Sequence, residues 1–190
     1  MDKKDLRKKQ IKLLAEYAKS AKKDEEDQLL LEQLMGSDLI KNSRSIGVTA
    51  SLPSEVDTSR LIARLWDQGK DVYLARANND HEHTQDFVYY TYMTKLKKSR
   101  FGVKEVDDAT APINNELDLI VVPGLAFALD SHQRLNFGGG YYDRFLAKHP
   151  ASQTVALVNS KMSFQTAVWP VEKTDVPVQT IILPDQILRG

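Results

Sequence analysis

The order strand, helix, strand within residues 45–75 constrains the fold of this chain more than any other feature. A first strand is predicted in "SIGVTASLP", which Pro53 ends, and a second in "DVYLA". Between them, residues 57–69 offer capping side chains, an apolar stripe at helical spacing and Gly69 as a stop. Such a βαβ unit implies parallel strands that are joined by a right-handed crossover.

Further strands extend this unit into a sheet. Residues 117–123, "LDLIVVP", are almost continuously apolar, so we expect a central strand that is covered on both faces. Two more short strands are predicted in "TVALVNS" and "QTIILP", and a helix in "YYDRFLAKH". Residues 78–86 and 95–116 lack a clear pattern and are expected to be loops. The alternation predicts a three-layer α/β/α fold with a mainly parallel, Rossmann-like sheet.

The N-terminal third of the chain predicts helices. Its leucines recur at helical spacing with lysines between them, and Gly36 is a plausible stop. A chain of 190 residues suits one domain. We therefore expect a single α/β domain over residues 1–190, in which a helical segment of about residues 1–42 packs on the core.

Composition excludes several kinds of site. The chain has no cysteine, which removes disulfides, thiolate nucleophiles and cysteine zinc sites. Its 26 acidic and 26 basic residues balance, so a uniform electrostatic grip on nucleic acid is not expected. No apolar run approaches the roughly 20 residues that span a bilayer. We expect a soluble, cytoplasmic monomer that binds neither nucleic acid nor membranes.

The stretch "RLNFGGGYYDR", residues 134–144, is the strongest candidate for a ligand site. Glycines allow positive φ and a close approach of backbone to ligand, and the helix that follows presents free N–H groups. Arg134 and Arg144 flank the glycines and can clamp phosphate oxygens. The pattern fits an anion cradle or a tight turn without a ligand, and it is neither a P-loop nor a GxGxxG fingerprint.

Other candidate residues each have a structural alternative. Asp143 can hold Mg²⁺ beside phosphate, or it can interact with the dipole of its own helix. Glu55 follows the first predicted strand, where ligands bind in open α/β sheets, or it is merely exposed. His81 and His83 form a possible metal pair without an evident third ligand. The lysines and arginine of "MDKKDLRKKQIKLL" reach phosphates or form a solvated helix face.

Three stretches together resemble the 5-formyltetrahydrofolate cyclo-ligase family, also called methenyltetrahydrofolate synthetases. From the N-terminus they are "KKDLRKK", "SEVDTSRLIARLWDQGKDVYLAR" and "LDLIVVPGLAFALDSHQRLNFGGGYYDRFL". This is also the order in which the family has them. The resemblance implies an ATP- and Mg²⁺-dependent cyclisation of 5-formyltetrahydrofolate, with or without a polyglutamate tail. The product is 5,10-methenyltetrahydrofolate, and ADP and phosphate are released through a phosphorylated formyl intermediate. That chemistry needs positioning and charge neutralisation and no covalent nucleophile.

The resemblance also assigns roles to residues of the nucleotide-binding core. It implies ATP contacts by Lys3, Lys4, Arg7, Arg134, Gly138, Gly139, Gly140, Tyr141 and Tyr142. It implies substrate contacts by Glu55, Phe137, Tyr141 and Tyr142, and Mg²⁺ ligation by Asp143 and Asp175. Arg134 and Tyr142 would be the catalytic residues, through positioning and charge stabilisation.

The chain departs from the family pattern at five positions: Val106 for proline, His132 and Asn136 for glycine, Phe137 where arginine often stands, and Thr174 for histidine. If position 136 needs a positive φ, asparagine is the least costly substitute for glycine. These departures leave open a paralogue that binds folate or nucleotide without turnover.

Overall fold

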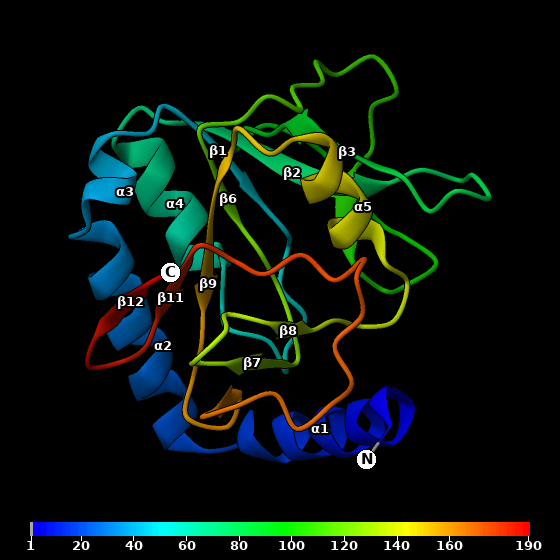
Figure 1. The fold of residues 1–190 in the computed structure, drawn as a ribbon. Coiled ribbons are helices and arrows are strands. Elements are labelled where there is room, and N and C mark those ends of the chain that lie inside the picture. The colour runs from blue at the N-terminus through cyan, green and yellow to red at the C-terminus, as the bar shows by residue number, and fades with distance from the viewer. Residues whose placement is uncertain (1) are drawn as a thin grey trace.

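A seven-stranded sheet in the order β12-β11-β9-β6-β1-β2-β3 forms the centre of the computed structural model, which describes residues 2–190 (Figure 1). Its strands are β1 (Ser45–Val48), β2 (Asp71–Ala77), β3 (Gln85–Tyr89), β6 (Leu119–Val121), β9 (Gln153–Leu157), β11 (Thr180–Ile182) and β12 (Ile187–Arg189). Strands β11, β9, β6, β1 and β2 are mutually parallel, whereas β12 and β3 pair antiparallel at the two edges. The predicted, mainly parallel sheet is therefore confirmed.

The βαβ unit is present as the sequence predicts. Helix α4 (Ser59–Asp67) joins β1 to the parallel strand β2, and Leu61 and Leu65 on its inner face are fully buried. Gly69 follows the helix with a φ of +70°, a conformation that glycine adopts at little cost. Strand β6 is buried at all three residues and lies at the middle of the sheet, as its apolar sequence predicts.

Helices cover both faces of the sheet. Figure 1 shows α2 (Ala21–Met35), α3 (Asp38–Lys41) and α4 on one side and α5 (Tyr141–Lys148) on the other, which confirms the three layers. Helix α1 (Lys3–Tyr17) lies apart from these, along one end of the molecule. One buried apolar cluster runs from Leu6 of α1 to Leu183 after β11, so the N-terminal helices share the core of the sheet.

Helix α1 is anchored at the carboxyl ends of the parallel strands. Gln10 is buried, and its Nε2 donates to the carbonyls of Leu125 and Lys161 at 2.8 Å each. These carbonyls lie in the connections that follow β6 and β9. The anchor places the basic start of α1 beside the edge at which α/β sheets bind ligands.

Two small sheets were not predicted. One contains β10 (Ser163–Phe164), β7 (Ala126–Ala128) and β8 (Arg134–Leu135), and the other is the hairpin of β4 (Leu96–Lys98) and β5 (Lys104–Val106). The loop predictions for 78–86 and 95–116 are wrong where β3 begins and where this hairpin forms. Strands of two or three residues are too short to show an alternating pattern. No helix among residues 2–190 is both long and apolar enough to cross a membrane.

Candidate functional site

A cavity of about 330 Å³ opens at the carboxyl ends of the parallel strands. Thr49 after β1, Ala77 at the end of β2 and Pro123 after β6 contribute to its wall. Residues of the β4–β5 hairpin and of 134–142 complete it. The position agrees with the rule that open α/β sheets bind ligands beyond the carboxyl ends of their strands.

The glycine loop, residues 138–140, forms one side of this cavity. Gly138 has a φ of +106° and Gly140 a φ of +71°, so both lie where other residues are strained. Gly140 is the N-cap of α5, and no side chain caps that end of the helix. The first N–H groups of α5 are therefore not used by a capping side chain, and the positive end of the helix dipole faces the loop.

Helix α1 brings Arg7 to the glycine loop. Its Nε donates to the Asn136 carbonyl and its Nη2 to the Asn136 Oδ1, both at 2.8 Å. A side chain at Gly138 would point at this guanidinium, about 3.6 Å away. Bare backbone at position 138 thus leaves Arg7 accessible from the loop, as its predicted phosphate role requires.

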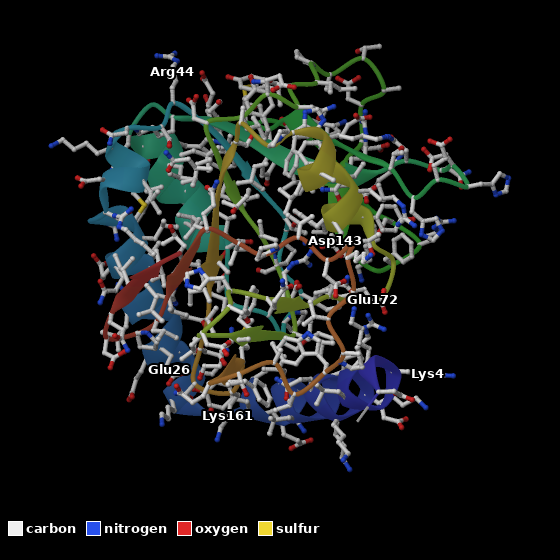
Figure 2. All side chains as sticks on the ribbon, viewed as in Figure 1. Lys4, Glu26, Arg44, Asp143, Lys161 and Glu172 are labelled. Carbon is white, nitrogen blue, oxygen red and sulfur yellow. The ribbon has the colours of Figure 1, made fainter. Side chains whose placement is uncertain are left out.

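Lys3 and Lys4, the other N-terminal cations for which ATP contacts are predicted, lie in different surroundings. Lys3 Nζ lies 2.6 Å from Asp175 Oδ2 and 3.5 Å from Glu172 Oε1. Lys4 is exposed and points away from the molecule, as Figure 2 shows. The structure therefore does not bring Lys4 together with Arg7 and the glycines.

Arg134 and Asp143 form a buried ion pair beneath the loop. Arg134 Nη2 lies 2.9 Å from Asp143 Oδ1, and its Nη1 donates to the Pro123 carbonyl at 3.2 Å. Asp143 also accepts from the Val176 N–H at 3.1 Å and from Asn136 Nδ2 at 2.6 Å. Burial lowers the pKa of Arg134, and the neighbouring Asp143 carboxylate opposes that shift.

The two predicted Mg²⁺ ligands are acids whose oxygens already accept hydrogen bonds. Both oxygens of Asp143 have donors, and Asp175 Oδ2 accepts from Lys3 and from the Glu172 N–H. Residues 2–190 contain no group of three or more acidic or histidine side chains that could hold a metal alone. Mg²⁺ usually takes one or two carboxylates and completes its shell with water and phosphate. The donor type of Asp143 and Asp175 fits that ion, and their metal role stays a prediction.

Glu55 and Tyr142 lie in the wall between β1 and the loop. Glu55 Oε2 accepts from the Leu52 N–H at 2.6 Å, and burial raises the pKa of Glu55. The Tyr142 hydroxyl shares a hydrogen bond with Thr49 Oγ1, and burial raises the pKa of Tyr142. The Arg134 guanidinium lies 5.9 Å from the centre of the Tyr142 ring. Tyr142 is thus a neutral phenol beside a cation, which fits a positioning role.

Aromatic residues form the rim of the cavity. Tyr141 stacks on His83, with ring centres 5.0 Å apart, and Phe101 meets Tyr141 edge to face at 5.7 Å. Phe137 also lines the cavity and is 45% exposed. Such rings offer flat apolar surface to a planar ligand, in keeping with the substrate contacts predicted for Phe137 and Tyr141.

His81 and His83, which the sequence suggested as a metal pair, lie in different surroundings. His83 Nδ1 lies 2.9 Å from the Gly139 carbonyl oxygen, and His83 has a φ of 55°. His81 is exposed. The loop that carries His83 therefore contacts the glycine loop, a link across 56 positions of sequence that local pattern does not reveal.

The residues that depart from the family pattern differ in backbone conformation and in burial. His132 and Asn136 both stand where the family has glycine. Of these two, only His132 has a positive φ, of 56°. The proposed backbone reason for asparagine at 136 is therefore wrong, and its side chain instead contacts Arg7, Asp143 and the Gly138 N–H. Thr174 is exposed, and Val106 is buried.

Among the cavity residues that the sequence did not single out are Thr49, Gln85, Phe101 and Glu105. Thr49 directly follows β1, so the carboxyl-end rule could have identified it. The other three lie on or beside strands that the sequence did not predict, and no local signal marks them.

Comparisons with known proteins agree with this architecture. The model of the 5-formyltetrahydrofolate cyclo-ligase family matches residues 1–184. The 5-formyltetrahydrofolate cyclo-ligase of Haemophilus influenzae is 31% identical over 146 residues, which cover 75% of this chain and 77% of the relative. The enzyme of the same name from Escherichia coli is 30% identical over 149 residues, which cover 76% and 80%.

A solved structure supports the fold. The structure of Aquifex aeolicus 5,10-methenyltetrahydrofolate synthetase superposes with a TM-score of 0.80 at 24% identity, and the match covers 100% of this chain and 93% of that one. The family match spans the glycine loop, the Arg134–Asp143 pair and the cavity. On these grounds the chain belongs to the 5-formyltetrahydrofolate cyclo-ligase family and is a ligase.

Proposed function

We propose that this protein uses ATP and Mg²⁺ to convert 5-formyltetrahydrofolate into 5,10-methenyltetrahydrofolate. A formyl group on nitrogen is a poor electrophile, and its oxygen is a poor leaving group. Transfer of the γ-phosphoryl group of ATP to the formyl oxygen gives an iminium phosphate and ADP. The secondary amine N10 of the same folate then attacks the formyl carbon, which closes the five-membered ring, and N10 releases its proton to solvent. The C–O bond then breaks, and phosphate leaves with the former formyl oxygen.

The observation that carries this proposal is a single cavity shared by a phosphate-type cradle and a wall for a planar ligand. Gly139, Gly140 and Arg134 line it together with Glu55 and Tyr142. Phosphoryl transfer depends mainly on positioning and on neutralising charge. The uncapped start of α5 and the two arginines, Arg7 and Arg134, supply positive potential on one side.

Mg²⁺, when bound, would neutralise phosphate charge, and Asp143 and Asp175 are the carboxylates proposed to hold it. In this structure Lys3 and Arg134 neutralise these two acids. Phosphate oxygens are strong acceptors for the same cations. The proposed role of Lys3, Arg7 and Arg134 is therefore to bind the phosphates of ATP, while Tyr141, Tyr142, Phe137 and Glu55 bind the folate.

A direct assay tests the reaction. Purified protein is mixed with ATP, Mg²⁺ and 5-formyltetrahydrofolate, and the near-ultraviolet absorbance of the methenyl product is followed together with ADP. We expect product and ADP to appear in equal amounts and only when ATP is present. Absence of an ATP-dependent rise would sink the proposal. Calorimetric binding of 5-formyltetrahydrofolate without turnover would then identify a paralogue that only binds folate.

A further inference from the structure

The carbonyl of Gly139 is held by two side chains that do not line the cavity. His83 Nδ1 lies 2.9 Å from the carbonyl oxygen, and Arg144 Nη1 donates to the same oxygen at 2.9 Å. A carbonyl oxygen only accepts, so His83 Nδ1 is the donor and carries a proton. The carbonyl and the following N–H of a trans peptide point in opposite directions. The two donors therefore also set the direction of the Gly140 N–H.

The ring of His83 makes a second contact, with Tyr141. The two rings stack with their centres 5.0 Å apart and their planes 17° from parallel. Tyr141 is held further by Arg100, whose Nη2 donates to its hydroxyl at 3.0 Å, and by the edge-to-face ring of Phe101. A side chain at Gly139 would meet the Tyr141 ring at 2.8 Å, so this ring lies directly against the glycine loop. His83 thus contacts both the backbone of the loop and the ring that packs on it.

The turn that carries His83, residues 78–84, is closed by its own hydrogen bonds. The Asp80 carboxylate accepts from the Thr84 hydroxyl and from the Thr84 N–H, the latter at 3.1 Å. These bonds lower the pKa of Asp80, so it is an ionised acceptor at neutral pH. The Asn78 N–H donates to the Thr84 carbonyl at 2.9 Å, and Asn78 Nδ2 donates to Thr84 Oγ1 at 3.0 Å. The turn therefore presents His83 from a fixed frame.

His83 itself has a strained backbone. Its φ of 55° lies in the left-handed region, where residues other than glycine are uncommon. Such strain persists only where the surroundings hold it, and it clusters at ligand sites. The partners that hold the His83 side chain are Gly139 and Tyr141 of the proposed phosphate cradle.

We propose that His83 is a positioning residue for ATP, which makes the glycine loop present N–H groups and not a carbonyl to the phosphates. This role rests on the proposed use of ATP. The peptide between Gly139 and Gly140 has glycine on both sides, so few steric barriers stop it from turning over. A carbonyl turned toward the phosphates would set its negative end against their charge, whereas successive N–H groups attract an anion. His83 and Arg144 hold the Gly139 oxygen in one orientation.

His83→Gly removes both contacts without adding strain, because glycine adopts a φ of 55° at little cost. We expect Tm to stay close to that of wild type. The dissociation constant of a non-hydrolysable ATP analogue with Mg²⁺, measured by calorimetry, should rise about 5-fold, as for one lost hydrogen bond. The KM for ATP should rise by the same factor and kcat should stay nearly unchanged, because the loop holds ATP equally in the ground state and the transition state.

Chemical rescue distinguishes positioning from a general structural role. Imidazole in solution can enter the space that His83→Gly opens, because His83 is only partly buried. At a pH of about 8.5 an imidazole ring is mostly neutral and still has one N–H to donate, whereas 1-methylimidazole has the same ring without that donor. We expect imidazole to restore most of the lost affinity for the ATP analogue and 1-methylimidazole to restore none. Equal rescue by the two compounds would overturn the role of the hydrogen bond.

The matched control is His81→Gly, the same change at an exposed position of the same turn, which should behave as wild type. His83→Asn replaces His83→Gly if the latter does not fold, because asparagine also tolerates a positive φ. A folded His83→Gly with wild-type affinity for the analogue, or an equal loss in His81→Gly, would overturn the proposal.

The outcome is separable from the proposed function. A wild type that turns over, with His83→Gly unaffected, sinks only the positioning role. A wild type that binds the ATP analogue without turnover, with the expected loss in His83→Gly, sinks only the reaction. A wild type that binds no nucleotide sinks both.

Discussion

The two sides of the cavity differ in how far their polar side chains are linked to one another. On the phosphate side, Arg7, Arg134, Asn136 and Asp143 are linked to one another by hydrogen bonds. Gln85 and Glu105 on the β3–β5 side are not part of such a network, and a buried donor without a partner occurs on each side, Arg134 Nε and Gln85 Nε2. The difference teaches that the charges on the phosphate side depend on one another, whereas the polar groups on the other side are largely independent. Removal of a buried charge on the phosphate side should therefore damage fold and turnover together, whereas removal of a charge on the other side should cost no stability.

The largest expected effect comes from Asp143→Asn. The sequence alone predicts a strong loss of turnover with little loss of stability. The buried pair changes that prediction, because asparagine leaves the Arg134 charge uncompensated and sets an amide N–H against Asn136 Nδ2. We expect a loss of about 3–5 kcal/mol in unfolding free energy and a fall in kcat of at least about 100-fold. Urea unfolding and the methenyl assay measure these, with the exposed Asp130→Asn as control.

A double variant separates the two effects. Arg134→Met with Asp143→Leu removes both buried charges, which is often neutral or stabilising compared with an unpaired one. We expect stability to recover toward wild type while turnover stays low. Recovery of turnover as well would mean that the pair serves only the fold.

A smaller effect is expected for Arg7→Met. Arg7 contacts the loop from outside the core and is half-buried, so its loss should leave stability almost unchanged. The KM for ATP should rise about 10-fold, as expected for one lost charge-assisted hydrogen bond of roughly 1.5 kcal/mol. Lys4→Met is the matched control on the same helix. An equal rise in Lys4→Met would restore the ATP contact that the sequence resemblance implies and the structure does not bring to the loop.

These positions also show how far the sequence determines the site. The parallel sheet, the βαβ unit and the glycine loop were predicted because each depends on a continuous pattern of neighbouring residues. Lys3 and Arg7 were expected at the phosphates through the resemblance, and the structure places Arg7 at the glycine loop. Gln85 and Glu105 were missed because their strands are short or lie at an edge, and because Ala77 brings them together across the sheet. Local pattern carries no information on such pairing.

Asn136→Gly tests whether the departure from the family pattern matters. A backbone explanation predicts that glycine at 136 improves the protein. The structure predicts the opposite, because the Asn136 side chain joins Arg7 to Asp143 and accepts from the Gly138 N–H. We expect a loss of about 1 kcal/mol, which lowers Tm by roughly 2–4 °C, and a rise of a few fold in the KM for ATP. A higher Tm in thermal melts would contradict this role.

The smallest expected effect is on the β3–β5 side of the cavity, where Glu105→Gln should change the thermal stability of the protein. Burial raises the pKa of Glu105 above its unfolded value, so the folded state favours the protonated acid. The resulting stabilisation is present below the unfolded pKa, about 4.3, and is lost as pH rises through the folded pKa. At neutral pH the ionised carboxylate is therefore a cost, which glutamine removes while its oxygen still accepts from the Ala77 N–H.

We expect Glu105→Gln to raise Tm by up to roughly 2–4 °C at pH near 7, with no gain near pH 4. Melts across that range, with Glu25→Gln as a flat reference, check it. A lower Tm at neutral pH would mean that the nearby cations Arg76, Lys97 and Arg100 already satisfy Glu105, and the contrast between the two sides of the cavity would fail at this residue.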